Sequence, residues 1–153
     1  MSSFPTSASE ISRPRSRPGE HPPPPATILV VESNPAAAEI LVLVLATAGY
    51  QAISTATGQR ALSTRAKLTP NLVVVGPSRA DMRPAQLCRA LRARTDAPIL
   101  VLSSDIDTGT VEPVVAGGAS ECLLIPISAR DLLTHITALL GSSHGREQAA
   151  IAV

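Results

Sequence analysis

Residues 27–50 read Thr-Ile-Leu-Val-Val-Glu-Ser-Asn-Pro-Ala-Ala-Ala-Glu-Ile-Leu-Val-Leu-Val-Leu-Ala-Thr-Ala-Gly-Tyr. The apolar run at 27–31 is typical of a buried strand. Asn34 is a favoured helix N-cap, and Pro35 suits the first helical turn. The strongly apolar stretch 36–48 then predicts a helix that ends before Gly49, a favoured residue just past a helix C-terminus. The stretch therefore predicts a strand, a short loop and a helix in succession.

The same alternation continues to residue 140. Short apolar runs that alternate with helical patterns indicate βαβ units and a parallel sheet. We therefore predict an α/β protein with a flavodoxin-like, doubly wound five-stranded parallel sheet in the order 2-1-3-4-5 and helices on both faces. The expected strands are 27–31, 51–54, 72–75, 99–102 and 122–124. The expected helices are 36–48, 58–67, 84–94, a shortened one at about 113–117, and one that follows a capping box at Ser128, runs to Leu140 and ends at Gly141.

The two ends of the chain differ from this central region. Residues 1–26 are rich in Pro, Ser and Arg and contain few aliphatic residues, so they cannot bury enough apolar surface to offset the cost of ordering. They also lack the apolar segment of a secretory signal. We expect a disordered tail at 1–26, one domain at 27–140, and a flexible tail at 141–153.

The composition excludes several classes of protein. A formal net charge of +1 argues against a broad nucleic-acid-binding surface. No apolar run approaches the roughly 20 residues of a membrane-spanning helix. Cys88 and Cys122 lie within apolar patterns and not at metal-ligand spacing, which favours buried, reduced thiols in a cytoplasmic protein.

In a sheet of this order, ligand chemistry sits at the carboxyl ends of strands one, three and four. Glu32 and Ser33 follow the first of these strands, Gly76 follows the third, and Ser103 follows the fourth. Gly76 is the most informative of these residues, because it brings no side chain to the middle of the expected site.

The chain resembles the CheY-like receiver domains of two-component response regulators over nearly all of residues 27–140. The motifs that carry the resemblance are Ile28-Leu29-Val30-Val31-Glu32, Gly49-Tyr50, Gly58 with Ala61-Leu62, Pro70-Asn71-Leu72-Val73, Leu87-Cys88-Arg89, Pro98-Ile99-Leu100-Val101-Leu102-Ser103, Gly118-Ala119-Ser120 and Pro126. Each motif is weak alone, but the ordered set is specific for the fold.

The resemblance implies that a phosphoryl-accepting Asp would stand at Gly76 in an active receiver. It also implies an acidic pair for Mg²⁺ at Glu32 and Ser33, where one carboxylate is missing, and a hydroxyl at Ser103, which is kept. The family's Lys before a cis-type proline is matched by Ile125, and its switch aromatic is matched by Cys122. With one carboxylate of three left, we expect no metal site, no cofactor and no enzymatic activity.

These observations predict a degenerate receiver that acts as a phosphorylation-independent protein–protein interaction module in signal transduction. Its partner would be a signalling protein or a second copy, with no nucleic acid bound by this chain alone and no membrane. A possible interaction face on the last helix comprises Leu132, Leu133, Ile136 and Leu140.

Two alternatives remain open. The first is phosphorylation in a phosphorelay through a substitute acceptor such as Asp81, a residue for which we expect instead a capping role at the helix beginning at Pro84. The second is a small-molecule sensor that uses the vacated pocket over Gly76, with Ser33, Ser103 and Ser104 as hydrogen-bonding groups.

Overall fold

The computed structural model describes residues 25–77, 81–104 and 115–152, with side chains described as far as residue 141. Five parallel strands form one sheet in the order β2-β1-β3-β4-β5, which confirms the predicted fold class. The strands are β1 (Thr27–Val31), β2 (Gln51–Thr55), β3 (Leu72–Val75), β4 (Ile99–Ser103) and β5 (Glu121–Leu124). The helices are α2 (Pro35–Thr47), α3 (Gly58–Leu68), α4 (Pro84–Arg92) and α6 (Ala129–Ala152).

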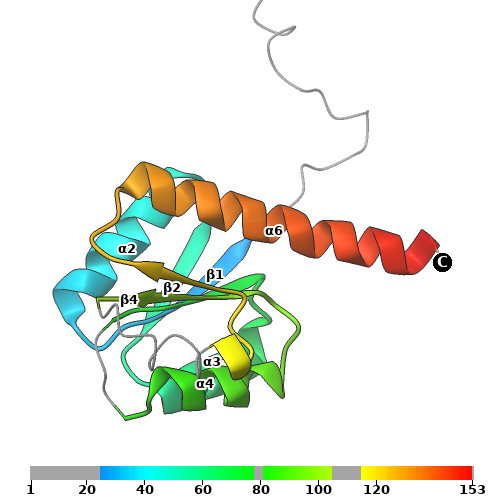
Figure 1. Ribbon diagram of the computed structural model, residues 1–153. Coiled ribbons are helices and arrows are strands. Elements are labelled where there is room, and N and C mark those ends of the chain that lie inside the picture. Colours follow the sequence, from blue (N-terminus) through cyan, green and yellow to red (C-terminus); the bar gives the residue numbers. More distant parts are fainter. Residues whose placement is uncertain (1–24, 78–80, 105–114, 153) are drawn as a thin grey trace, which may run out of the picture.

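The helices cover both faces of the sheet (Figure 1): α2 and α6 lie on one side, and α3 and α4 lie on the other. Successive side chains of a strand point to opposite faces, so the central strands supply two separate apolar clusters. Leu29 and Val73 pack with Leu91 of α4 in one cluster. Ile28 and Val74 pack with Ile136 of α6 in the other. This arrangement explains why β1 and β3 are apolar at nearly every position.

Local signals set most element boundaries. The side chain of Asn34 accepts hydrogen bonds from the backbone N–H groups of Ala36 and Ala37, at 3.0 and 3.2 Å, and so caps α2 as expected. At the other end of α2, Gly49 has a φ of +96°, a conformation that glycine adopts without the Cβ penalty. The predicted start and end of this helix are thus within one residue of those observed.

The last helix is longer than predicted. It continues to Ala152, so the expectation that it ends at Gly141 is wrong. Gly141 does not adopt a positive φ, and a glycine inside a helix costs only about 1 kcal/mol relative to alanine. In Figure 1 the carboxyl-terminal part of α6 runs past the edge of the sheet.

Three other expectations concern the end of α4 and segments that lie wholly or partly outside the described residues. Helix α4 ends at Arg92 and not at Arg94, since the next two residues form a turn. Residues 115 and 116 are helical, but the rest of the short helix expected at about 113–117 lies partly outside the described residues. The tail expected at 1–26 also falls outside them, apart from residues 25 and 26.

Candidate functional site

The candidate site lies where β1 and β3 end side by side. These strands pair in parallel as far as Val31 and Val75. One residue further, the N–H of Gly76 donates to the carbonyl oxygen of Val31 at 2.8 Å, and the N–H of Glu32 donates to that of Thr55 at 3.0 Å. The backbones of Glu32 and Gly76 are therefore both held by the sheet.

The side chain of Glu32 is buried at this point, with 2% of the residue exposed. Its Oε2 accepts a hydrogen bond from the N–H of Asn34 at 2.7 Å, which holds the carboxyl group beside the loop after β1. A Cβ built on Gly76 would lie 2.9 Å from Cδ and 3.1 Å from Cβ of Glu32. The Glu32 side chain thus fills the space in which a side chain at residue 76 would begin.

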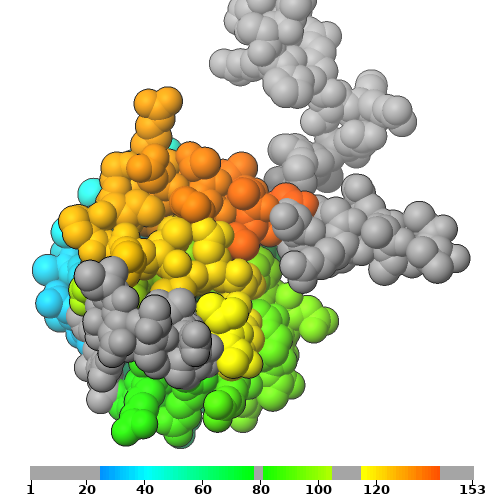
Figure 2. All heavy atoms as spheres, in the orientation of Figure 1, coloured from blue at the N-terminus to red at the C-terminus, as the bar shows by residue number. Residues whose placement is uncertain are grey.

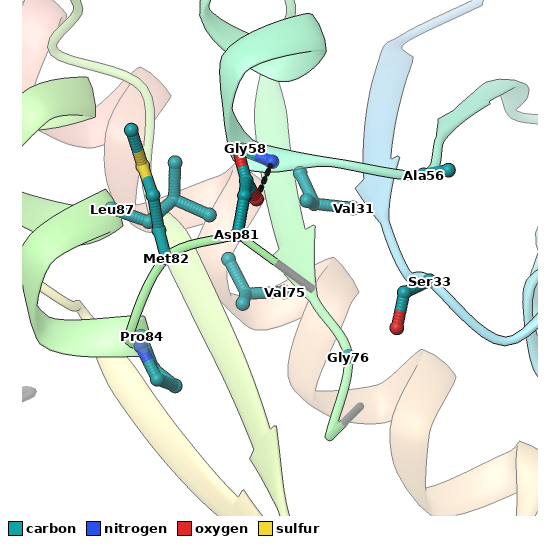
Figure 3. A pocket seen from close by; sticks show the side chains of 10 residues that line it. All are labelled: Val31, Ser33, Ala56, Gly58, Val75, Gly76, Asp81, Met82, Pro84 and Leu87. Atoms are coloured by element: carbon teal, nitrogen blue, oxygen red, sulfur yellow. Dashed lines mark hydrogen bonds between the residues drawn. The ribbon is translucent and has the colours of Figure 1, made fainter. Parts of the chain in front are cut away.

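The pocket lined by Gly76 is small, whereas a separate pocket of about 730 Å³ is lined by Glu32, Ser33 and Thr55. The pocket that includes Ser33 and Gly76 has a volume of about 20 Å³, which is close to the space that one water molecule needs. Figure 3 shows its lining, with Ser33 and Gly76 on one side and Asp81 turned toward Gly58. Among the described residues, this pocket offers no space for a metabolite, which argues against a small-molecule sensor at Gly76.

Asp81 caps a different helix from the one predicted. Its Oδ1 accepts from the N–H of Gly58 at 2.7 Å, and its Oδ2 accepts from the N–H of Gln59 at 3.0 Å. Both bonds are at the start of α3, whereas Arg83 caps α4 without any side-chain hydrogen bond. The hydrogen bonds from Gly58 and then Gln59 hold the pKa of the Asp81 carboxyl below its usual value. The predicted cap of the helix at Pro84 is therefore wrong, because long-range packing brings the α3 terminus to this carboxylate.

The remaining positions implied by the resemblance lie along β4 and β5. Ser103 is half-buried at the end of β4, and its carbonyl oxygen accepts from the N–H of Ile125 at 2.9 Å. The Ile125–Pro126 peptide bond is cis. Ile125 packs against the apolar cluster beneath α2 and α6, so an apolar contact stands where the resemblance implies a lysine.

Cys122 is half-buried and packs against the cluster beneath α3 and α4, which includes Cys88. Burial raises the pKa of both thiols, that of Cys88 to about 11. Both cysteines therefore behave as small apolar side chains. Neither is a candidate nucleophile.

The face predicted on α6 is only partly accessible. Leu132 and Ile136 are buried, at 4% and 0% exposure, and belong to the core. Leu133 and Leu140 are half-buried and pack against the same cluster. The prediction that these four residues form an interaction face is therefore wrong for Leu132 and Ile136, whose side chains cover the sheet. Figure 2 shows the outer surface that α6 forms above β5 and α4.

The residues do not fit a magnesium site. Within the described part of the chain, no three His, Cys, Asp or Glu side chains gather closely enough to hold a metal ion. Mg²⁺ needs an octahedral set of oxygen ligands, and Glu32 is the only acidic residue at the ends of β1 and β3.

Sequence reasoning missed two features of this site. One is the cap that Asp81 supplies to α3, and the other is the position of the Glu32 side chain over Gly76. The sequence contained a signal for the position of the Glu32 side chain. Glu32 has a long side chain, Gly76 has no Cβ, and the two residues follow strands that were predicted to be neighbours.

The comparisons with known proteins agree with this geometry. The model of the response regulator receiver domain family matches residues 28–137. The chain therefore belongs to this family and is a receiver domain of two-component signalling. Among solved structures, the chemotaxis protein CheY4 of Vibrio cholerae has the same fold, with a TM-score of 0.71 and 22% identity over 75% of this chain and 98% of that one.

The curated relatives are longer proteins. The DNA-binding response regulator MtrA of Mycolicibacterium smegmatis is 32% identical over 113 residues, which cover 74% of this chain and 50% of MtrA. The cell cycle transcriptional regulator CtrA of Caulobacter vibrioides is 26% identical over 81% of this chain and 54% of CtrA. The chain thus spans about half the length of these relatives, and they give no support to the expectation that nucleic acid is excluded as a partner.

Proposed function

We propose that this receiver domain acts as a protein–protein interaction module whose state does not depend on phosphorylation. The observation that carries the proposal is Gly76, which follows β3 and brings no carboxylate to the position that would accept the phosphoryl group. Phosphoryl transfer depends on a positioned acceptor and on cations that stabilise the developing charge. The domain is accordingly not an enzyme, and its partner is a signalling protein or a second copy in the cytoplasm.

Exposed apolar side chains support a role in binding a protein. Ile40 and Leu43 on the outer surface of α2 are each 62% exposed, and Leu124 at the end of β5 is 47% exposed. Ile40 and Leu43 are three residues apart on one helix and are therefore neighbours on its surface, and neighbouring exposed apolar side chains commonly mark contacts between proteins. No helix in the described ranges is long and apolar enough to cross a membrane.

The test is the intact mass of the protein after incubation with a small phosphodonor and Mg²⁺. A receiver of known activity serves as the control. We expect no adduct on this protein while the control is modified. A stoichiometric, acid-labile adduct would overturn the proposal and would make Asp81 the first residue to replace.

A substitute acceptor is the weaker alternative. Both carboxylate oxygens of Asp81 are already bonded to the first turn of α3. Attack by Asp81 on a phosphodonor would have to break these hydrogen bonds. The carboxylate is also turned away from Gly76 and Ser33 (Figure 3).

A second candidate function is the receiver half of a DNA-binding regulator. The observation in its favour is the match to MtrA, of which this chain covers 50%. Such a role would add a DNA-binding region outside this domain, and the domain itself would still act through protein contacts. DNA binding, measured by fluorescence anisotropy on this domain with and without the sequence that adjoins it in the gene, would separate the two cases.

A further inference from the structure

Gly76 has an ordinary backbone conformation, and this is the starting point of the inference. Its φ does not lie in the left-handed region, unlike those of Gly49 and Gly118 at +96° and +116°. The N–H of Gly76 also makes a regular sheet hydrogen bond to Val31. The backbone at residue 76 could therefore carry any L side chain without conformational strain.

What excludes a side chain at residue 76 is the side chain of Glu32. The three atoms nearest to a Cβ built on Gly76 all belong to Glu32. The nearest of them is Oε1, at the end of the side chain, and to move the carboxyl group away would break the hydrogen bond that Oε2 accepts from the N–H of Asn34. At Gly58 a Cβ would also meet the end of a side chain, the Met82 sulfur at 2.8 Å, but that side-chain end carries no charge.

We infer that Glu32 and Gly76 form a matched pair, in which the acidic side chain of Glu32 takes the place of a side chain at residue 76. The acceptor pocket then holds a built-in acidic group that comes from β1 instead of β3. This inference deepens the proposed function, but its test does not require that the proposed function be correct.

The test is a double-mutant cycle with thermal unfolding as the readout. We expect Gly76→Ala to lower Tm by about 5–10 °C in the parent, as overpacking of a tight site does. In a Glu32→Ala background the same change should lower Tm by less than half as much. Gly141→Ala is the matched control for a Gly-to-Ala change, since a Cβ there meets nothing within 4 Å, and we expect it to leave Tm unchanged or raise it.

Two further variants keep the test decisive if Glu32→Ala does not fold. Glu32→Gln keeps the length of the side chain, so the penalty of Gly76→Ala should persist. Glu32→Asp shortens it, so the penalty should shrink. If Gly76→Ala lowered Tm equally in every background, or did not lower it in the parent, the inference that Glu32 and Gly76 form a matched pair would be wrong. A phosphoryl adduct on the parent protein would instead overturn the proposed function and leave the pair standing.

Discussion

Asp81 shows how a single carboxylate joins two parts of this fold. It lies in the segment after β3 but bonds to Gly58 and Gln59 at the start of α3, 23 and 22 residues away. The first N–H groups of a helix have no partner within the helix, and an anion there is stabilised by the helix dipole. The role of Asp81 is therefore to hold the segment after β3 against α3.

We predict that Asp81→Ala lowers Tm by a few degrees, because two N–H groups of α3 lose their acceptor. Asp81→Asn should retain more of the stability, since its amide oxygen can still accept one of these bonds. Thermal unfolding followed by circular dichroism measures both variants. Equal stability of Asp81→Ala and the parent would contradict this role.

The pH dependence of this contribution follows from the lowered pKa. A carboxyl whose pKa is lower in the folded protein than its usual 3.8 contributes its stability above that value. The contribution is lost as the pH falls through the folded pKa. The difference in Tm between the parent and Asp81→Ala should therefore be constant near neutral pH and narrow below pH 3.8. A difference that widens on acidification would contradict this assignment.

At the scale of elements, α2 is the helix whose surface is least explained by the fold. Only Ala38 and Leu45 are buried on it, although its sequence is apolar on nearly every side. A helix that packs on a sheet needs one apolar stripe. The additional side chains Ile40 and Leu43 contribute to the surface and not to the core.

We predict that Ile40→Ser and Leu43→Ser each change the free energy of unfolding by no more than about 0.5 kcal/mol, as exposed positions do. Leu45→Ala, at a position with 0% exposure on the same helix, should cost about 2–5 kcal/mol. Urea denaturation measures all three. A large loss on replacing Ile40 or Leu43 would show that these side chains are buried in an assembly of copies.

At the scale of the whole molecule, the fold of a receiver is present although several residues differ from those that the family resemblance implies. The sheet, its strand order and the cis peptide bond before Pro126 are present. Gly76, Ser33 and Ile125 stand where the family resemblance implies two carboxylates and a lysine. The apolar clusters on the two faces hold the sheet and helices together, and none of these three residues is in the buried part of either cluster.

We predict that millimolar Mg²⁺ does not raise Tm. A ligand stabilises a folded protein only in proportion to its binding, and Glu32 alone cannot supply the oxygen ligands that the ion needs. Differential scanning fluorimetry with and without Mg²⁺ measures the effect, with an active receiver as the positive control. A rise in Tm that saturates with Mg²⁺ concentration would contradict the absence of a metal site.

The amino-acid sequence by itself determined the fold and placed a glycine where the resemblance implies an acceptor. Buried parallel strands require continuous apolar runs such as Leu72–Val75, and these runs alternate with helix signals such as Asn34 and Pro35. Such signals are local, so they can be recognised without knowledge of the rest of the molecule. The absence of a carboxylate at Gly76 is likewise a property of one position in that pattern.

The tertiary structure alone decided which side chains fill the site. It placed Glu32 over Gly76 and turned Asp81 toward α3, and it put Leu132 and Ile136 in the core instead of on a binding face. Each of these outcomes depends on contacts between elements distant in sequence, and on how much space those elements leave. Sequence periodicity identifies the apolar side of a helix or strand, but only packing determines which neighbour occupies the space beside it.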